Sequence, residues 1–283
     1  MVPTSITAER WRSVRTSLRE TGGRFAELAS SERNPQGSAI GTWSAGETAA
    51  HVATVTSMYT ALLSSPENSH PFPEIAQRVR SAALDEIAAL NDFTLRHMTE
   101  RDPRVLGQRI RDDIEVVLDA TADLDPAEPV GWLGGARLPV AGWCAHLLNE
   151  LLIHGHDIAG SAGTRWEVPQ PDAALAFELF LVALLSNDTG KLLSHEPIRR
   201  DRVAVEFRSR YTSPVVLTAH DGRITATASA REIDVHVFFQ PAGLMLILFG
   251  RLGKLRAALT GRAVVWGRRP WLLLAFLHSV RFP

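Results

Sequence analysis

The sequence predicts a mixed, multidomain α plus α/β fold: a helical bundle at residues 1–165 and a smaller α+β domain at residues 170–283. Apolar residues in the first part recur three and four positions apart, as they do in amphipathic helices. Beyond residue 169, short segments alternate between apolar and polar residues, which is typical of half-buried strands. A chain of 283 residues is long enough for two such domains.

The first two expected helices are separated by a loop that contains Pro35 and Gly37. The second helix begins at a capping box, because Ser44 and Glu47 have the spacing at which each side chain binds the other's backbone amide. It should end near Pro66, ahead of a proline-rich loop at residues 65–73. The apolar stripe of the first helix consists of Trp11, Val14, Leu18, Phe25 and Leu28, and that of the second includes Val55, Met58 and Leu62.

Three further helices complete the predicted bundle. The third has the polar residue Asn91 within its apolar stripe, and the fourth has Pro103 in its first turn. A loop at residues 125–139 leads to the fifth helix, expected at about 140–162 with Gly163 as its stop. The stripes are Leu84, Ile87, Leu95 and Met98 for the third helix, Leu106, Ile110, Val117 and Leu124 for the fourth, and Leu147, Leu151 and Ile158 for the fifth.

The C-terminal part should contain a mixed set of elements. Asp221-Gly222 is a common two-residue hairpin turn between two of its strands. We expect strands at 202–209, 214–219, 223–230, 233–239 and 262–266, and helices at 173–185, 241–259 and 270–278.

Composition limits the possible partners and the location of the protein. The 30 basic and 31 acidic residues nearly cancel, which predicts no nucleic-acid partner and no attraction to an anionic membrane. No signal peptide is recognisable and no apolar run approaches the length of a bilayer span, so we expect a cytoplasmic monomer or homodimer. The single cysteine, Cys144, excludes an internal disulfide and predicts that any thiol chemistry uses an external thiol.

The fifth helix carries the residues best suited to bind a metal. Glu150 and His154 are four positions apart and therefore share one helix face. His51, on the apolar face of its own helix, is the best-placed third ligand. Two imidazoles and one carboxylate with an open position are typical of catalytic zinc. Spacing alone leaves open a solvated ion pair or a core histidine.

Two segments resemble the signatures of the DinB-like, mycothiol-dependent maleylpyruvate isomerase family. Residues 42–51, Thr-Trp-Ser-Ala-Gly-Glu-Thr-Ala-Ala-His, are similar to its first helical motif, and residues 149–157, Asn-Glu-Leu-Leu-Ile-His-Gly-His-Asp, to its second. Residues 248–251, 259–262 and 267–270 resemble the sterol-carrier-like α+β domain that is appended in this family.

The resemblance implies a bundle that binds a divalent metal, zinc being expected, through His51, Glu150 and His154. It also implies mycothiol, a sugar-linked cysteine thiol of actinobacteria, as cosubstrate, with a small electrophilic or acidic second substrate. Arg262 matches a family arginine that is thought to bind the substrate carboxylate, so it is expected in both catalysis and ligand binding. Asn91 either reaches the cavity and contacts the cosubstrate or is a buried structural amide.

One position departs from the family pattern: His156 occupies the place where a tryptophan is usual. His156 therefore either takes part in catalysis or faces solvent. His146, one turn before Glu150, either hydrogen bonds to a ligand or packs in the core, and Asp157 either orients His154 or pairs with an arginine.

The leading functional hypothesis is a metal-dependent enzyme that transfers mycothiol sulfur to a small electrophile. Three alternatives stay open: a mycothiol-dependent cis–trans isomerase of the maleylpyruvate type, a non-enzymatic small-molecule or lipid-binding protein, and a thiol-independent metal hydrolase.

Overall fold

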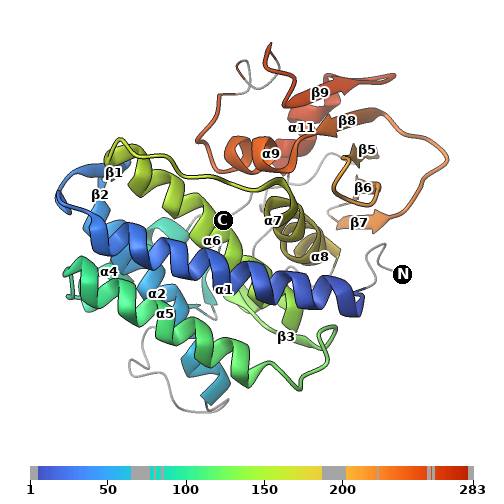
Figure 1. Cartoon of the computed structure of the whole chain (residues 1–283). Helices are drawn as coiled ribbons and strands as arrows, with labels where there is room; N and C mark the ends of the chain where they lie inside the picture. Colours follow the sequence, from blue (N-terminus) through green and yellow to red (C-terminus); the bar gives the residue numbers. More distant parts are fainter. Residues whose placement is uncertain are drawn as a thin grey trace.

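The computed structural model describes residues 6–64, 77–79, 81–83, 86–186, 202–221, 223–253, 256 and 259–279. Figure 1 shows the helices of the N-terminal half packed side by side, with the strands of the C-terminal part gathered beyond one end of them. This arrangement confirms the predicted fold class. The predicted proline-rich loop at 65–73, the third-helix residue Leu84 and the turn residue Gly222 lie outside the described residues.

Four helices form the predicted bundle, in which α1 and α2 each pack against both α5 and α6. A shorter helix, α4, packs against α2 on one side of the bundle. The stripe residues Leu18, Phe25, Leu106, Ile110 and Leu147 are all buried, as their spacing predicts. The bounds are Ala8–Ser31 for α1, Ala45–Ser64 for α2, Ile87–His97 for α4, Pro103–Ala120 for α5 and Val140–Ser161 for α6.

The capping box at the start of α2 is confirmed. The Glu47 amide donates to Ser44 Oγ at 3.2 Å, and the Ser44 amide donates to Glu47 Oε2 at 2.8 Å. Pro103 likewise occupies the first position of α5, after the capping residue Asp102. These local interactions fix where the two helices begin.

Two small hairpins occupy segments that the sequence predicts as loops. Strands β1 (Ser38–Ile40) and β2 (Trp43–Ser44) pair just before α2, and strands β3 (Pro129–Gly131) and β4 (Arg137–Pro139) pair just before α6. Strands of two or three residues are too short to show an alternating pattern, so the sequence gives no sign of them. Both hairpins contribute residues to the pocket described below.

Two helix ends differ from the prediction. Helix α5 ends at Ala120, so Leu124 lies beyond it and is 42% exposed rather than part of a buried stripe. Helix α9 ends at Leu248 instead of residue 259, and Gly250 follows with a φ of 75°. A left-handed glycine is a common helix terminator, which explains the early end of α9.

One helical segment connects the bundle with the sheet. Helices α7 (Gln170–Leu175) and α8 (Ala183–Ser186) flank a π-helical stretch, η3, at Ala176–Val182. Phe180 packs against His146 of α6, whereas Phe177 packs against Phe207 and Phe239 of the sheet. Because this helical segment contacts both parts of the chain, the predicted domain bounds of 1–165 and 170–283 stay a prediction.

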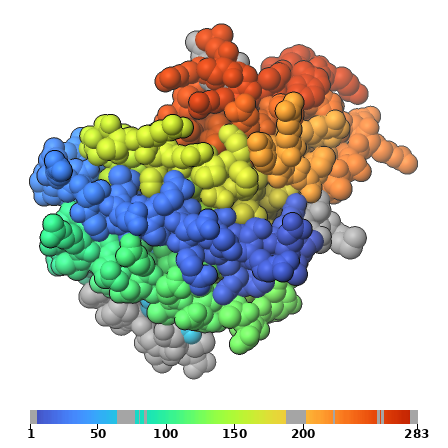
Figure 2. Space-filling view, viewed as in Figure 1, coloured from blue at the N-terminus to red at the C-terminus, as the bar shows by residue number. Residues whose placement is uncertain are grey.

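The C-terminal part is a five-stranded mixed sheet in the order β7-β6-β5-β8-β9, covered by helices α9 and α11. Strands β5 and β8 are parallel, and the other pairs are antiparallel. Figure 2 shows this part, in orange and red, packed directly on α6 and the α7–α8 segment, in yellow-green and yellow. The bounds are Val203–Arg208 (β5), Val215–His220 (β6), Arg223–Thr227 (β7), Val235–Phe239 (β8), Ala263–Trp266 (β9), Pro241–Leu248 (α9) and Leu272–Ser279 (α11). None of the helices described is both long and apolar enough to cross a bilayer.

Candidate metal centre

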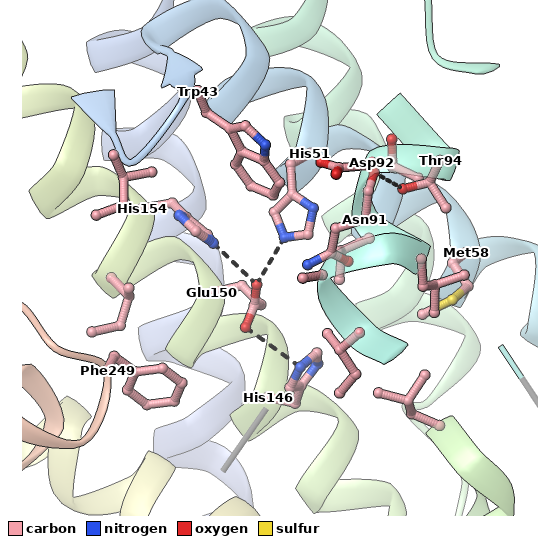
Figure 3. Close-up of a pocket in the computed structure, with 18 of the residues that line it drawn as sticks. Trp43, His51, Met58, Asn91, Asp92, Thr94, His146, Glu150, His154 and Phe249 are labelled. Carbon is pink, nitrogen blue, oxygen red and sulfur yellow. Dashed lines mark hydrogen bonds and ion pairs between the residues drawn. The ribbon is translucent and has the colours of Figure 1, made fainter. Parts of the chain in front are cut away.

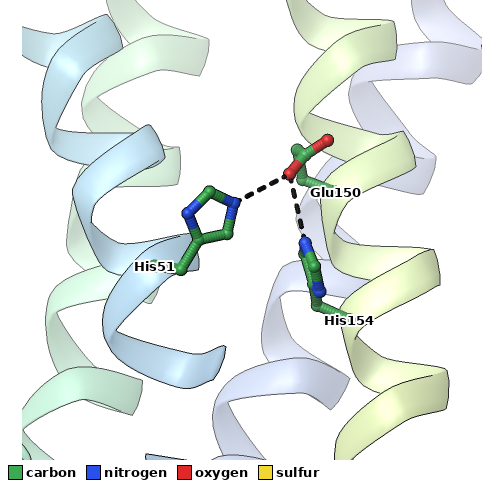
Figure 4. A group of neighbouring side chains, drawn as sticks. All are labelled: His51, Glu150 and His154. Carbon is green, nitrogen blue, oxygen red and sulfur yellow. Dashed lines mark hydrogen bonds and ion pairs between the residues drawn. The ribbon is translucent and has the colours of Figure 1, made fainter. Parts of the chain in front are cut away.

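Helices α2 and α6 bring the three predicted metal ligands together. His51 extends from α2 towards Glu150 and His154, which lie one turn apart on α6 (Figure 4). The Nε2 atoms of His51 and His154 each lie 3.4 Å from Glu150 Oε2. One ligand atom from each of the three residues lies within 4.8 Å of the others, and all three side chains are largely buried.

The separation of these atoms fits a bound ion. A distance of 3.4 Å is long for an N–H···O hydrogen bond. Two ligands that are each about 2.1 Å from a tetrahedral zinc would lie about 3.4 Å apart. In addition, His51 Nδ1 is buried without a hydrogen-bond partner among the described residues, so its ring is held by packing, against Trp43 in particular. The cluster can therefore hold a divalent metal and leave a position open towards the pocket.

The electrostatics of the cluster follow from burial and from these contacts. Burial alone would raise the pKa of Glu150, but His154 and His51 outweigh it and hold that pKa well below its usual value. Burial lowers the pKa of His51. For His154, burial is outweighed by the carboxylates of Asp157 and Glu150, which raise its pKa to about 9. Without a metal, His154 is therefore a cation between two carboxylates.

Asp157 connects His154 to the C-terminal part of the chain. Asp157 Oδ2 lies 3.1 Å from His154 Nδ1, and the same carboxylate accepts hydrogen bonds from Arg251 Nε and Nη2 at 3.0 and 2.6 Å. Both roles considered for Asp157, orienting His154 and pairing with an arginine, are thus present together. A carboxylate that fixes the outer nitrogen of a ligand histidine is a common feature of metal sites.

A second chain of contacts reaches Glu150 from the other side. Trp132 Nε1 donates to the Tyr59 hydroxyl at 3.0 Å, and that hydroxyl lies 2.9 Å from His146 Nδ1. Because the indole can only donate, the Tyr59 hydrogen is free to bind Nδ1. Burial lowers the pKa of His146, so the ring is neutral and carries its proton on Nε2, which lies 3.5 Å from Glu150 Oε1. His146 is thus packed in the core against Trp132 and Phe180, and its Nε2 also lies near a candidate metal ligand, at a distance that is long for a hydrogen bond.

A pocket of about 460 Å³ opens onto the cluster (Figure 3). Its walls come from the β1–β2 hairpin, α2, α4, the β3–β4 hairpin, α6, η3 and the segment after α9. They are mostly apolar or aromatic, and the apolar and aromatic side chains are Ile40, Trp43, Val55, Met58, Val79, Ile87, Ala88, Leu90, Trp132, Leu133, Ile153, Phe180 and Phe249. A mostly apolar pocket with a few convergent polar groups is typical of a small-molecule site.

Of the other predicted site residues, one lines the pocket and two lie outside its lining. Asn91 is partly buried and lines the pocket beside His51 (Figure 3), so the arrangement permits the predicted contact with a cosubstrate. Arg262 lies just before β9, is exposed, and is not among the residues that line the pocket. His156 is also outside the lining, with a half-exposed side chain 4.0 Å from Asp157. The roles predicted for Arg262 and His156 stay predictions that this geometry does not favour.

Sequence reasoning missed two side chains of the site, Tyr59 and Trp132, which contact or line it. Arg251 was considered only as one of several basic C-terminal residues that either bind an acidic substrate or face solvent, and not as the partner of Asp157. Arg251 lies in one of the segments that resemble the family, which was a usable signal. Trp132 lies in a segment predicted to be a loop, and Tyr59 lies one residue beyond the expected stripe position Met58.

Comparison with known proteins supports the resemblance. Two solved structures are similar over most of the chain, a mycothiol-dependent maleylpyruvate isomerase and a histidine-to-alanine variant of such an isomerase. The first has a TM-score of 0.52 at 14% identity and covers 86% of this chain and 90% of the other. The second has a TM-score of 0.52 at 12% identity and covers 90% and 92%. At these identities the likeness concerns the fold.

Among curated proteins none matches the chain. A family model described as the mycothiol maleylpyruvate isomerase N-terminal domain matches residues 14–159, just over half of the sequence and the whole of the candidate metal centre. The chain therefore belongs to the mycothiol maleylpyruvate isomerase family, as the two helical motifs predicted.

Proposed function

We propose that this protein is a metal-dependent enzyme that uses mycothiol as a nucleophile. In this S-transfer reaction the whole thiol becomes attached, through its sulfur, to a small electrophilic substrate. The observation that carries the proposal is the convergence of His51, Glu150 and His154 in the wall of a largely apolar pocket. The family to which the chain belongs is described by its use of mycothiol, which supports the choice of thiol.

The chain's own residues would bind and orient the reactants. His51 and His154 offer one ring nitrogen each, and Glu150 offers one carboxylate oxygen, while His146 Nε2 lies 3.5 Å from the other oxygen. The chemistry that a divalent ion supplies in such a set is stabilisation of a thiolate at neutral pH. Asn91, which lines the pocket, can hydrogen bond to a polar part of either reactant.

The internal cysteine does not compete for this role. Cys144 is fully buried, and burial raises the pKa of its thiol to about 12. A thiol with that pKa is protonated at neutral pH and is a poor nucleophile. The proposed chemistry therefore needs a thiol from outside the chain.

Isomerisation is the second candidate reaction, favoured by the description of the family. In that reaction the thiolate adds to an activated double bond, rotation follows and the thiol leaves unchanged. In S-transfer, the thiol stays in the product. Product analysis separates the two, because only S-transfer consumes thiol in proportion to substrate.

The decisive experiment combines metal analysis with calorimetric titration. We expect near-stoichiometric divalent metal in the purified protein and its loss in His51→Ala, Glu150→Ala and His154→Ala. We expect mycothiol to bind the metal-loaded protein more tightly than glutathione. A protein without metal would support the non-enzymatic alternative, and activity in thiol-free buffer would support the hydrolase.

A further inference from the structure

We propose that the electrophile accepted by this pocket is uncharged and largely apolar, rather than a carboxylate. This inference rests on the proposed function, since it concerns the second substrate of the same site. It is argued from the chemistry of the pocket walls and from the charges that face the pocket.

The apolar lining of the pocket includes Met58, Leu90, Trp132, Phe180 and Phe249, which together we call the apolar chamber. Leu90, Trp132 and Phe180 are 7%, 6% and 1% exposed, so they are fixed by packing. The polar atom of Trp132 is already bound to the Tyr59 hydroxyl, and the indole therefore presents ring carbons. A ligand in this chamber gains apolar contact and finds few hydrogen-bond partners.

A carboxylate would find no unpaired cation among the lining residues that the structure describes, because His154 already lies between the carboxylates of Glu150 and Asp157. Among the lining residues that the structure describes, Arg251 is the one arginine or lysine, and each of its three guanidinium nitrogens donates to an oxygen of the chain. Two of these nitrogens bind the buried carboxylate of Asp157, which neutralises the charge locally. Asp92, an exposed lining residue, adds negative charge near His51 and Asn91 (Figure 3).

A bound divalent metal would not provide a spare positive charge for a substrate carboxylate once the thiolate is present. The two positive charges of a divalent ion held by this cluster would be matched by the Glu150 carboxylate and by one thiolate. A carboxylate on the electrophile would then be a buried charge without a counterion, which is strongly unfavourable.

Two further arginines, Arg96 and Arg101, line a separate, more open cleft that shares Thr42, Trp43 and Asp92 with the pocket. Arg101 in that cleft donates to the backbone carbonyls of Leu95, Met98 and Glu100. Arg96 lies there together with the acidic residues Glu47 and Asp92. These cations line the neighbouring cleft and do not face the apolar chamber.

The test compares two substrates that share one activated aryl chloride and differ in carrying a neutral methyl ester or a charged carboxylate, methyl 4-chloro-3,5-dinitrobenzoate and 4-chloro-3,5-dinitrobenzoate. With mycothiol, each would form a carbon–sulfur bond and lose the chlorine as chloride, while the thiol proton passes to solvent. We expect kcat/KM, corrected for the uncatalysed rate, to favour the ester by roughly 100-fold or more. We also expect the ester to bind the metal-free protein more tightly than the carboxylate does, as measured by quenching of tryptophan fluorescence.

A variant tests whether the lack of an unpaired cation in the apolar chamber causes the preference for the ester. Met58→Arg adds a guanidinium to the chamber, and we expect it to narrow the preference for the ester by about tenfold or more. Met98→Arg is the matched control, because Met98 is a partly buried methionine outside the pocket lining, and it should keep the wild-type preference.

Equal or better use of the free carboxylate by the wild-type protein would overturn the inference, whatever the behaviour of the variants. Preferential binding of the ester without any mycothiol-dependent turnover would uphold the inference about the pocket and contradict the proposed function. The two proposals can thus fail separately.

Discussion

Arg251 holds Asp157 with two hydrogen bonds, and through Asp157 it holds the ring of His154. The pair is buried, with side-chain exposures of 16% and 3%. Arg251 follows α9, whereas Asp157 belongs to α6, so an interaction between the two parts of the chain fixes the orientation of a candidate metal ligand.

Replacement of Asp157 by Asn should therefore affect both stability and metal binding. Removing one partner of a buried ion pair costs about 3–5 kcal/mol of folding free energy. Loss of a group that orients a ligand histidine lowers metal affinity by about 10–100-fold. Urea unfolding of the metal-free protein and competition with a chromophoric chelator measure the two effects. Glu115→Gln, in the exposed pair with Arg19, is the control and should cost about 1 kcal/mol or less. Unchanged metal affinity in Asp157→Asn would contradict the assignment.

Tyr59→Phe tests the contact that reaches Glu150 through His146. The substitution removes the hydroxyl that binds both Trp132 Nε1 and His146 Nδ1, and should lower metal affinity by about tenfold. Thr56→Val is a matched control on the same helix, because it removes a buried hydroxyl that binds Asp113 away from the cluster. Each variant should cost about 1–3 kcal/mol of stability, and only Tyr59→Phe should weaken the metal site. Equal metal affinities would show that Tyr59 has a structural role alone.

The raised pKa of His154 predicts how the stability of the metal-free protein depends on pH. Protonated His154 is stabilised in the fold by Asp157 and Glu150, which raise its pKa from 6.5 to about 9. Its contribution is fully present below pH 6.5 and is lost as the pH rises towards 9. We expect the free energy of unfolding to fall by on the order of 2 kcal/mol across this window. His154→Gln should remove most of that dependence, and a flat profile in the wild type would be inconsistent with the pKa.

Cys144 should be inert in the folded protein. Because burial raises the pKa of its thiol to about 12, reagents for thiolates should not modify it under native conditions. Titration with Ellman's reagent should detect no thiol in the native state and one after unfolding in guanidinium. Rapid native modification would mean that the interior of the bundle opens readily, and mycothiol would then not be the obvious source of the thiolate.

Gly155, between His154 and His156, should not tolerate a side chain. A Cβ atom at this position would lie 2.3 Å from the Trp166 ring, and Trp166 is itself fixed by a hydrogen bond to the Leu152 carbonyl. We expect Gly155→Ala to destabilise the protein by about 1–3 kcal/mol. Gly160→Ala, on the same helix with no neighbouring atoms within 4 Å, should be neutral or stabilising by up to about 1 kcal/mol. Thermal unfolding of both variants distinguishes local crowding from a general effect of helix propensity.

The sequence by itself determined the helices of the bundle and the three candidate ligands. The apolar stripes of α1, α5 and α6 have the period of a helix, and the starts of α2 and α5 depend on side chains within three residues of each other. Glu150 and His154 share a helix face for the same local reason, and His51 was identified by its place on an apolar stripe and by the motif around it. Such features depend on interactions close in sequence, which a pattern can record.

Only the tertiary structure decided what surrounds those ligands. Tyr59 is 87 residues from His146, and Arg251 is 94 residues from Asp157, so no local pattern could pair them. The short hairpins that supply Trp43 and Trp132 left no periodic signal, and the exposed position of Arg262 follows from the packing of the sheet. The sequence could therefore indicate a metal site, while the buried contacts around its candidate ligands and the apolar walls of the pocket arise from packing between segments far apart in the chain.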